Sequence, residues 1–349
     1  MRIAIVNDSV MAVECLRRVI DSEPQHEVAW VANDGAEAVW RCSADVPDLI
    51  LMDLIMPVMD GVEATRKIME DSPCAILVVT STVSGNASKV FQAMGHGALD
   101  AVNTPVLGMT GGAEGKGELL NKIATIAKLI KQRKSDTPIV TAAPTPVRGA
   151  GSNKGLVAIG SSSGGPKALS VLLQTLPADF PAPIVIVQHV DEKFSSELAV
   201  WSNKQCQLEV RLAEKGDTLI PGRVLIAGTN NHLILKSDNS LDYTPNPAEL
   251  AYRPSVDVFY ASVGEHWDGD VVAVLLTGMG RDGAEGLLNL RNKGVLTIAQ
   301  DERTCAVYGM PKAAAQINAA KEILPLDDIS PELISYFSKK NKKNRVSTS

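Results

Sequence analysis

Short apolar runs alternate with helical patterns in two separate parts of this chain. In the first part the predicted strands cover residues 3–6, 27–32, 49–52, 75–80 and 101–102. In the second part they cover residues 156–159, 183–188, 223–227, 233–236, 271–276 and 295–299. Because such alternation brings strands into parallel pairing, the sequence predicts an α/β protein with two doubly wound sheets, the second mainly parallel.

A stretch rich in proline, glycine and small residues separates the two parts. Residues 137–152 show no core-forming periodicity, and a chain of 349 residues is long enough for two cores. We therefore predict a first domain at residues 1–130, an interdomain linker at 131–154 and a second domain at 155–338. The lysine-rich residues 339–349 predict a basic, disordered tail, with binding to an acidic partner or a membrane surface as the alternative.

Charge, apolar runs and cysteine usage exclude several classes of function. A net charge of -6 argues against a protein that neutralises a nucleic-acid backbone. No apolar run reaches the length of a membrane span, and the apolar start of the chain is too short for a signal peptide. The five cysteines lie far apart without C-x-x-C spacing, as in a reducing compartment. We expect a cytoplasmic protein with no nucleic-acid partner and no membrane insertion.

Acidic residues follow two strands of the first part. Asp8 comes after the first predicted strand, Asp53 comes after the third, and Thr80 ends the fourth. Ligands collect outside the carboxyl ends of the strands in a doubly wound sheet, so these side chains are expected to converge. Two carboxylates with a nearby backbone carbonyl can hold Mg²⁺, which bridges to phosphate oxygens. The alternative is that Asp8 and Asp53 only cap helix N-termini.

The first domain resembles the receiver domain of two-component response regulators over residues 1–125. The resemblance rests on the acidic loop at Asp8, on Thr80, and on a run that contains Asp53, Pro57, Asp60 and Gly61. It implies that Asp53 is the phosphoacceptor, that Thr80 contacts the phosphoryl group, and that Mg²⁺ is bound by Asp8, Asp53 and the Ile55 carbonyl. The implied phosphodonor is a chemosensory histidine kinase.

This first domain departs from the receiver pattern at three positions. Asn7 stands where receivers usually have a second acid, Thr104 stands where they have a lysine before proline, and Ala101 replaces a common aromatic residue. Metal and phosphoryl chemistry remain the prediction, whereas the sequence leaves open the route by which the signal passes from the phosphoryl group to the distal surface.

The second part carries a candidate nucleophile, base and orienting acid at three strand ends. Ser162 lies in a G-x-S-x-G turn between a strand and a helix opened by proline, a pattern that can also cradle a nucleotide phosphate. His189 ends the next apolar strand and could take the serine proton. Asp282 follows another buried strand and could fix the imidazole tautomer, or cap the following helix. The Ser163 and Met279 amides are candidates for an oxyanion hole.

The chain order Ser162, His189, Asp282 disfavours an ordinary lipase or esterase. Residues 153–340 resemble the catalytic domain of the chemotaxis protein-glutamate methylesterases, the CheB family, on the motifs at 159–165, 187–189, 221–227, 253–257 and 276–284. The resemblance implies Ser162 as nucleophile, His189 as base and Asp282 as orienter. The order of receiver, linker and hydrolase is also that of the family.

The resemblance further implies a phosphorylation-regulated hydrolase. Its substrates would be glutamyl methyl esters of methyl-accepting chemoreceptors, with deamidation of glutamine at the same site and no cofactor for hydrolysis. With Asn7 and Thr104, the chain looks most like the methylesterase of Wsp-type surface-sensing pathways.

The flexible linker motivates the hypothesis that the unphosphorylated receiver covers Ser162 and that phosphorylation at Asp53 uncovers it. A response regulator that only binds receptors is the alternative function.

Overall fold

The computed structural model describes residues 1–81, 85–107, 113–133, 152–250 and 252–347, and it separates into two compact units at residues 139 and 140. Most of the predicted linker lies outside the described residues. Of its ends, residues 131–133 are helical and residues 152–154 belong to a strand, so regular structure extends further into this stretch than the sequence indicated.

The first unit is a five-stranded parallel sheet in the order β2-β1-β3-β4-β5, as the alternation of strands and helices predicted. Apolar side chains of β1, β3 and β4 form its core with α1 and α5. Its elements are β1 (Arg2–Val6), α1 (Val10–Asp21), β2 (Glu27–Ala32), α2 (Gly35–Ala44), β3 (Leu49–Met52), α3 (Gly61–Asp71), β4 (Ala75–Thr80), α4 (Ala87–His96), β5 (Asp100–Asn103), β6 (Val106–Leu107), β7 (Ala113–Glu114) and α5 (Lys116–Arg133).

Polar side chains begin three helices of this unit. The Ser9 hydroxyl accepts from an amide of α1, and the Asp34 and Asp60 carboxylates accept from amides of α2 and α3. Such caps satisfy amides that have no acceptor within the helix. Asp8 and Asp53 cap none of these helices, so the capping-only alternative for those two residues is not supported.

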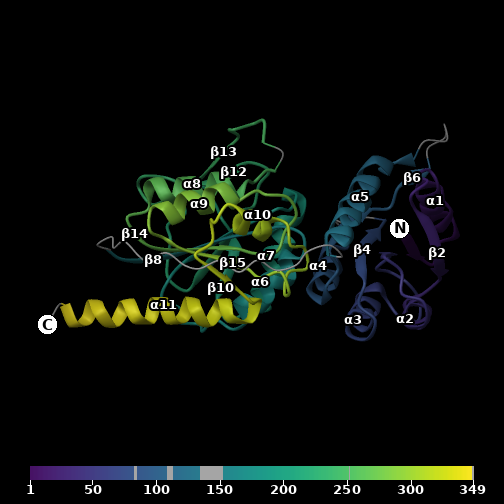
Figure 1. The fold of residues 1–349 in the computed structure, drawn as a ribbon, viewed down its shortest axis with the longest axis horizontal. Coiled ribbons are helices and arrows are strands. Elements are labelled where there is room, and N and C mark those ends of the chain that lie inside the picture. Colours follow the sequence, from purple (N-terminus) through teal and green to yellow (C-terminus); the bar gives the residue numbers. More distant parts are fainter. Residues whose placement is uncertain (82–84, 108–112, 134–151, 251, 348–349) are drawn as a thin grey trace. The chain divides into compact units, whose positions relative to one another are not determined.

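The second unit has a seven-stranded sheet in the order β10-β11-β9-β8-β14-β15-β16, and all its strand pairs are parallel. Figure 1 shows α8 and α9 over one face of this sheet and α6 and α11 over the other. Its elements are β8 (Ser152–Ser161), α6 (Gly165–Gln174), β9 (Ile184–Gln188), α7 (Glu192–Asn203), β10 (Glu209–Leu212), β11 (Arg223–Ile226), β12 (His232–Leu235), β13 (Leu241–Thr244), α8 (Val256–His266), β14 (Gly269–Leu275), α9 (Ala284–Asn292), β15 (Leu296–Gln300), α10 (Met310–Gln316), β16 (Glu322–Leu324) and α11 (Leu326–Ser347).

The strand predicted at 233–236 is present as β12, which pairs antiparallel with β13 in a hairpin outside the large sheet. The edge strands β10 and β16 were not predicted, since each is short and carries charged residues that break the apolar pattern.

The predicted disordered tail is also corrected. Helix α11 continues to Ser347, past the point where the lysine-rich sequence begins. Ile329, Leu333 and Phe337 recur at four-residue spacing and are buried, and the Phe337 ring packs edge-on against Phe180 with ring centroids 5.7 Å apart. Once these contacts hold the first turns, each further residue adds a hydrogen bond without a new nucleation step.

The topology places the ends of three central strands together. Strand β8 lies between β9 and β14. The strands that follow it in the sequence are added on both sides of it: β9, β11 and β10 on one side, and β14, β15 and β16 on the other. This is the switch point at which open α/β sheets bind ligands. Among the described helices, none has the length and apolar content needed to cross a membrane.

Candidate active site

The turn after β8 holds Ser162 at the switch point. The Ser162 amide donates to the Thr277 carbonyl at 3.1 Å, and the Gly165 amide donates back to the Ser162 carbonyl at 2.8 Å. Gly164 has a φ of 75°, a left-handed conformation that favours glycine, and α6 begins directly after it. Ser162 is only 8% exposed. The glycines of this motif thus permit a tight turn that fixes the serine backbone on two sides.

Gln188, which the sequence analysis did not single out, holds this turn from β9. Its side-chain oxygen accepts from the Ser161 hydroxyl at 2.7 Å, and its Nε2 donates to the Ser162 carbonyl at 2.9 Å. A Cβ built on Gly165 would lie 1.9 Å from the Gln188 Oε1 atom, so any larger residue there would displace the amide that holds the turn. In the sequence, the feature that indicates this role of Gln188 is its position as an amide residue at the end of an otherwise apolar strand.

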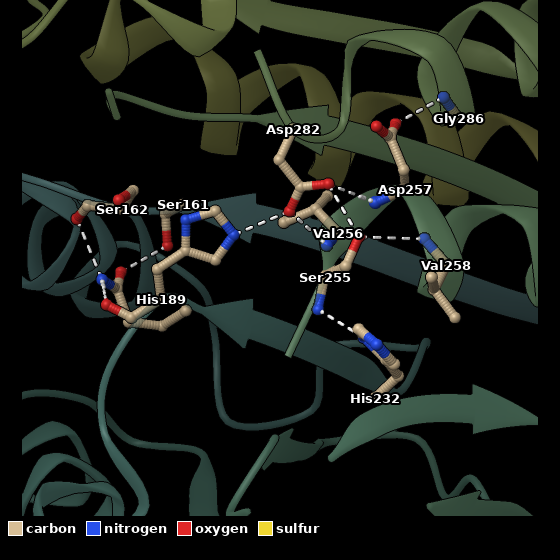
Figure 2. Close-up of polar contacts among 11 residues, drawn as sticks. Ser161, Ser162, His189, His232, Ser255, Val256, Asp257, Val258, Asp282 and Gly286 are labelled. Carbon is tan, nitrogen blue, oxygen red and sulfur yellow. Dashed lines mark hydrogen bonds and ion pairs between the residues drawn. The ribbon is translucent and has the colours of Figure 1, made fainter. Parts of the chain in front are cut away.

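The predicted base and orienting acid are in direct contact. His189 Nε2 lies 2.7 Å from Asp282 Oδ2, and the two side chains are 9% and 8% exposed. The His189 amide donates to the Ser161 carbonyl at 3.0 Å, which fixes the base beside the nucleophile turn. Figure 2 shows the imidazole between the two serines on one side and Asp282 on the other.

The second ring nitrogen of His189 has no partner within the described part of the chain. Nδ1 is buried and makes no hydrogen bond there, and the Ser162 hydroxyl makes none to the imidazole. With Nε2 bonded to Asp282, Nδ1 is the nitrogen left for a proton from substrate or serine. A serine–histidine bond that forms only with substrate is common in structures without ligand.

Four donors hold the Asp282 carboxylate. Its Oδ2 accepts from the Val256 amide at 2.7 Å as well as from His189, and its Oδ1 accepts from the Ser255 hydroxyl at 2.7 Å and the Asp257 amide at 3.1 Å. Burial opposes the charge, but these hydrogen bonds and the imidazole keep the pKa of Asp282 below its ordinary value. Asp282 is therefore an anion that can fix one imidazole tautomer.

Asp282 does not cap its own helix. Gly283 is the N-cap of α9 and provides no side-chain bond, whereas Asp282 binds the amides at the start of α8. Asp257 of α8 in turn accepts from the Gly286 amide of α9 at 2.6 Å (Figure 2). Burial and the nearby charge of Asp282 raise the pKa of Asp257 to about 6.

The two candidate oxyanion donors lie on turns that meet at Ser162. A Cβ built on Gly278 would lie 2.8 Å from the Ser162 Cβ atom, so the Thr277–Met279 turn approaches the nucleophile closely. Among the hydrogen bonds of the described residues, none uses the Ser163 or Met279 amide as donor. Both N–H groups are thus available to a ligand.

The acidic site of the first unit centres on Asp53. Burial raises the pKa of Asp53, and the charge of Asp8 adds to this, against opposing hydrogen bonds from the Leu54 and Ile55 amides and from Thr80. The Leu54 amide donates to Asp53 Oδ1 at 2.7 Å. The structure therefore brings Asp8, Asp53 and Thr80 together as predicted.

Asn7 occupies one side of the same carboxylate. Its Nδ2 donates to Asp53 Oδ2 at 3.0 Å, and its own side-chain oxygen accepts from the Ser9 amide at 2.8 Å. The half-buried Asp53 and the exposed Asp8 repel each other, and their carboxylates are an oxygen donor set suited to a hard divalent cation. The residues present thus fit a metal ion that would neutralise this repulsion.

The fold and the two sites define a class: a response regulator whose receiver unit precedes an α/β hydrolase unit. Family models agree with this division, since residues 3–107 match the response regulator receiver domain and residues 157–333 match the CheB methylesterase. The chain belongs to the CheB methylesterase family.

Its relatives match along almost the whole chain. Protein-glutamate methylesterase/protein-glutamine glutaminase 3 of Pseudomonas aeruginosa is 55% identical over 97% of this chain and 100% of its own length. Protein-glutamate methylesterase/protein-glutamine glutaminase 1 of Pseudomonas fluorescens is 58% identical with the same coverage. The crystal structure of the Thermotoga maritima CheB methylesterase catalytic domain is 39% identical, covers 52% of this chain and 97% of that one, and gives a TM-score of 0.49.

Proposed function

We propose that this protein hydrolyses glutamyl methyl esters of methyl-accepting chemoreceptors and deamidates receptor glutamines at the same site. The observation that carries the proposal is the buried His189–Asp282 contact at the ends of the two strands that flank the Ser162 strand. The activities in the names of the two relatives support the choice of substrate. Because the proposed partners are the signalling segment of a receptor and a histidine kinase, we propose that the protein acts in the cytoplasm.

In the proposed reaction the Ser162 oxygen attacks the ester carbonyl while His189 Nδ1 takes the serine proton. Asp282 stays ionised and stabilises the imidazolium. The Ser163 and Met279 amides would bind the oxyanion, because they converge on the serine without acceptors of their own in the described structure.

The intermediate collapses when its methoxy group takes the proton from His189 and leaves as methanol, which gives an acyl-enzyme. Water then attacks the acyl carbonyl, His189 takes the proton of this water, and Ser162 regains it as the carboxylate leaves. For a glutamine side chain the first leaving group is ammonia. No cofactor takes part in either sequence.

For the first unit we propose phosphorylation of Asp53 by a chemosensory histidine kinase. Asp8, Asp53 and the Ile55 carbonyl would hold Mg²⁺, which supplies charge neutralisation for phosphoryl transfer. The Thr80 hydroxyl, which lies close enough to Asp53 to influence its pKa, would contact the phosphoryl group. Phosphorylation is proposed to increase ester hydrolysis, and a chain that lacks residues 1–150 is expected to hydrolyse faster than the full chain.

The decisive experiment measures methanol release from methyl-labelled receptor membranes. Ser162→Ala and His189→Ala should each lower the rate by about a thousandfold or more. Ser196→Ala, at an exposed serine of α7, is the matched control and should retain the wild-type rate. A Ser162→Ala variant that still lowers receptor methylation would instead favour the alternative, a response regulator that acts only by binding receptors.

A separate experiment tests the receiver and the pathway. Asp53→Asn should abolish phosphate incorporation from a phosphorylated kinase, whereas Asp71→Asn, at an exposed acid of α3, should not.

We further propose that the protein acts in a Wsp-type surface-sensing pathway, because Asn7 and Thr104 are the signature of that type. Loss of the protein should then change surface attachment and leave swimming steering intact; the opposite pattern would reject this pathway.

A further inference from the structure

A tyrosine ring lies flat against the proposed base. The Tyr252 and His189 rings are stacked, with centroids 4.5 Å apart and planes inclined by 5°. Tyr252 is half-buried and lies three residues before Ser255, the N-cap of α8 and a ligand of the Asp282 carboxylate. The segment that reaches the orienting acid thus also covers one face of the imidazole.

The other end of the same side chain contacts a glycine turn. Gly280 has a φ of +84°, and a Cβ built on it would lie 2.7 Å from the Tyr252 hydroxyl oxygen. Gly280 directly follows Met279, whose amide is a proposed oxyanion donor. Tyr252 therefore touches both the base and the turn that would bind the developing negative charge.

The hydrogen bond to Asp282 leaves one motion of the imidazole unrestrained. Nε2 lies close to the axis of the Cβ–Cγ bond, so a ring bonded at Nε2 can still turn about Cβ–Cγ, and such rotation would swing Nδ1 away from a line to Ser162. Flat contact with an aromatic ring removes this rotation. The face of an aromatic ring also attracts a cation, so it favours the imidazolium over the neutral imidazole.

We propose that Tyr252 is a positioning residue for ester hydrolysis: its ring fixes the plane of His189 and stabilises the imidazolium that forms when Ser162 loses its proton. This inference rests on the proposed function, because it assigns Tyr252 a role through the base of that reaction. The charged groups on the other side of His189 are Asp282, which bonds it, and Asp257, which contacts Asp282. Substitution of Tyr252 leaves both in place.

The test compares Tyr252→Phe, which keeps the ring, with Tyr252→Leu and Tyr252→Met, which keep apolar bulk without a π face. The assay is kcat/KM for ester hydrolysis by the full chain from pH 5 to 9. Tyr252→Phe should stay within about twofold of wild type, and the non-aromatic variants should lose about three- to thirtyfold. In the two non-aromatic variants the acidic limb of the kcat/KM profile should move to lower pH by about half a pH unit or more, because the imidazolium loses a stabilising contact. KM should change little.

Three results would overturn the inference. One is an unchanged acidic limb in both non-aromatic variants, which would leave Tyr252 a packing role only. Another is an equal loss in Tyr252→Phe, which would assign the effect to the hydroxyl. An NMR titration of the His189 imidazole that gives the same pKa in wild type and Tyr252→Met would be the third, and it does not depend on activity. Absence of methanol release by the wild type would reject the proposed function itself, a different outcome.

Discussion

Replacement of Asp257 by asparagine should stabilise the second unit at neutral pH and not at acidic pH. The pKa of this carboxyl rises from an ordinary 3.8 to about 6 in the folded protein, through burial and the charge of Asp282. Between these two pH values the folded state binds the proton more tightly than the unfolded state, so stability falls as the pH rises. Above pH 6 the full penalty is present. Because asparagine cannot ionise, the Asp257→Asn variant avoids this penalty.

The magnitude follows from the two pKa values. At about 1.4 kcal/mol per tenfold change in acidity, the shift corresponds to about 3 kcal/mol. Asp257 is only partly buried, and solvent screening reduces the expected gain to about 2 kcal/mol. The asparagine oxygen can still accept from the Gly286 amide, so the cap on α9 is retained.

Urea unfolding of a full chain in which Trp30 and Trp40 are replaced by phenylalanine, followed by the fluorescence of Trp201 and Trp267 in the second unit, measures this effect. The difference in unfolding free energy between Asp257→Asn and wild type should grow by about 1 kcal/mol from pH 4.5 to pH 7.5, because part of the penalty is already present at pH 4.5. Asp179→Asn, at an exposed acid of the same unit, should show no such trend. A difference that is equal at both pH values would refute the assignment of a raised pKa to Asp257.

Three further substitutions have expected outcomes from the close contacts. Gly278→Ala places a Cβ 2.8 Å from that of Ser162 and should lower ester turnover at least about tenfold, with a loss of about 1–3 kcal/mol in urea unfolding. Gln188→Leu leaves the Ser162 carbonyl without its side-chain donor and should destabilise the second unit by a similar amount in the same assay. Gly61→Ala places a Cβ 1.9 Å from the Asp53 carbonyl oxygen. It should abolish phosphate incorporation and leave the unfolding of the second unit unchanged.

The sequence was sufficient to predict the sheets and the strand-end residues. Buried parallel strands are nearly continuous apolar runs, and the residue after such a run lies at the carboxyl edge, which is why His189 and Asp282 could be paired before any coordinates. The same logic correctly brought Asp8 and Asp53 together in the first unit.

Contacts between residues far apart in the sequence could not be predicted in this way. The Tyr252 ring, the Gln188 amide and the Ser255 hydroxyl reach the site from segments whose local pattern gives no direction for a side chain. The pairing of β12 with β13 could not be predicted because a four-residue apolar run fits either a strand of the sheet or a hairpin. The end of helix α11 was predicted to be disordered because amino-acid composition carries no information about the packing that anchors the first turns of this helix.

The two carboxylates at the start of α8 and α9 explain each other's behaviour. Asp282 receives four hydrogen bonds, including one from the imidazole, and its pKa is lowered, whereas Asp257 lies beside that anion and its pKa is raised. A buried acid and a partly buried acid in contact cannot both ionise easily, and the one with more donors keeps the charge. The repulsion between the two carboxylates therefore raises the pKa of Asp257, and Asp282, the partner of His189, stays ionised whether or not Asp257 holds a proton. Each carboxylate accepts from the amides of the other's helix, so the division is fixed by the Ser255 hydroxyl and the His189 imidazole, which bond Asp282.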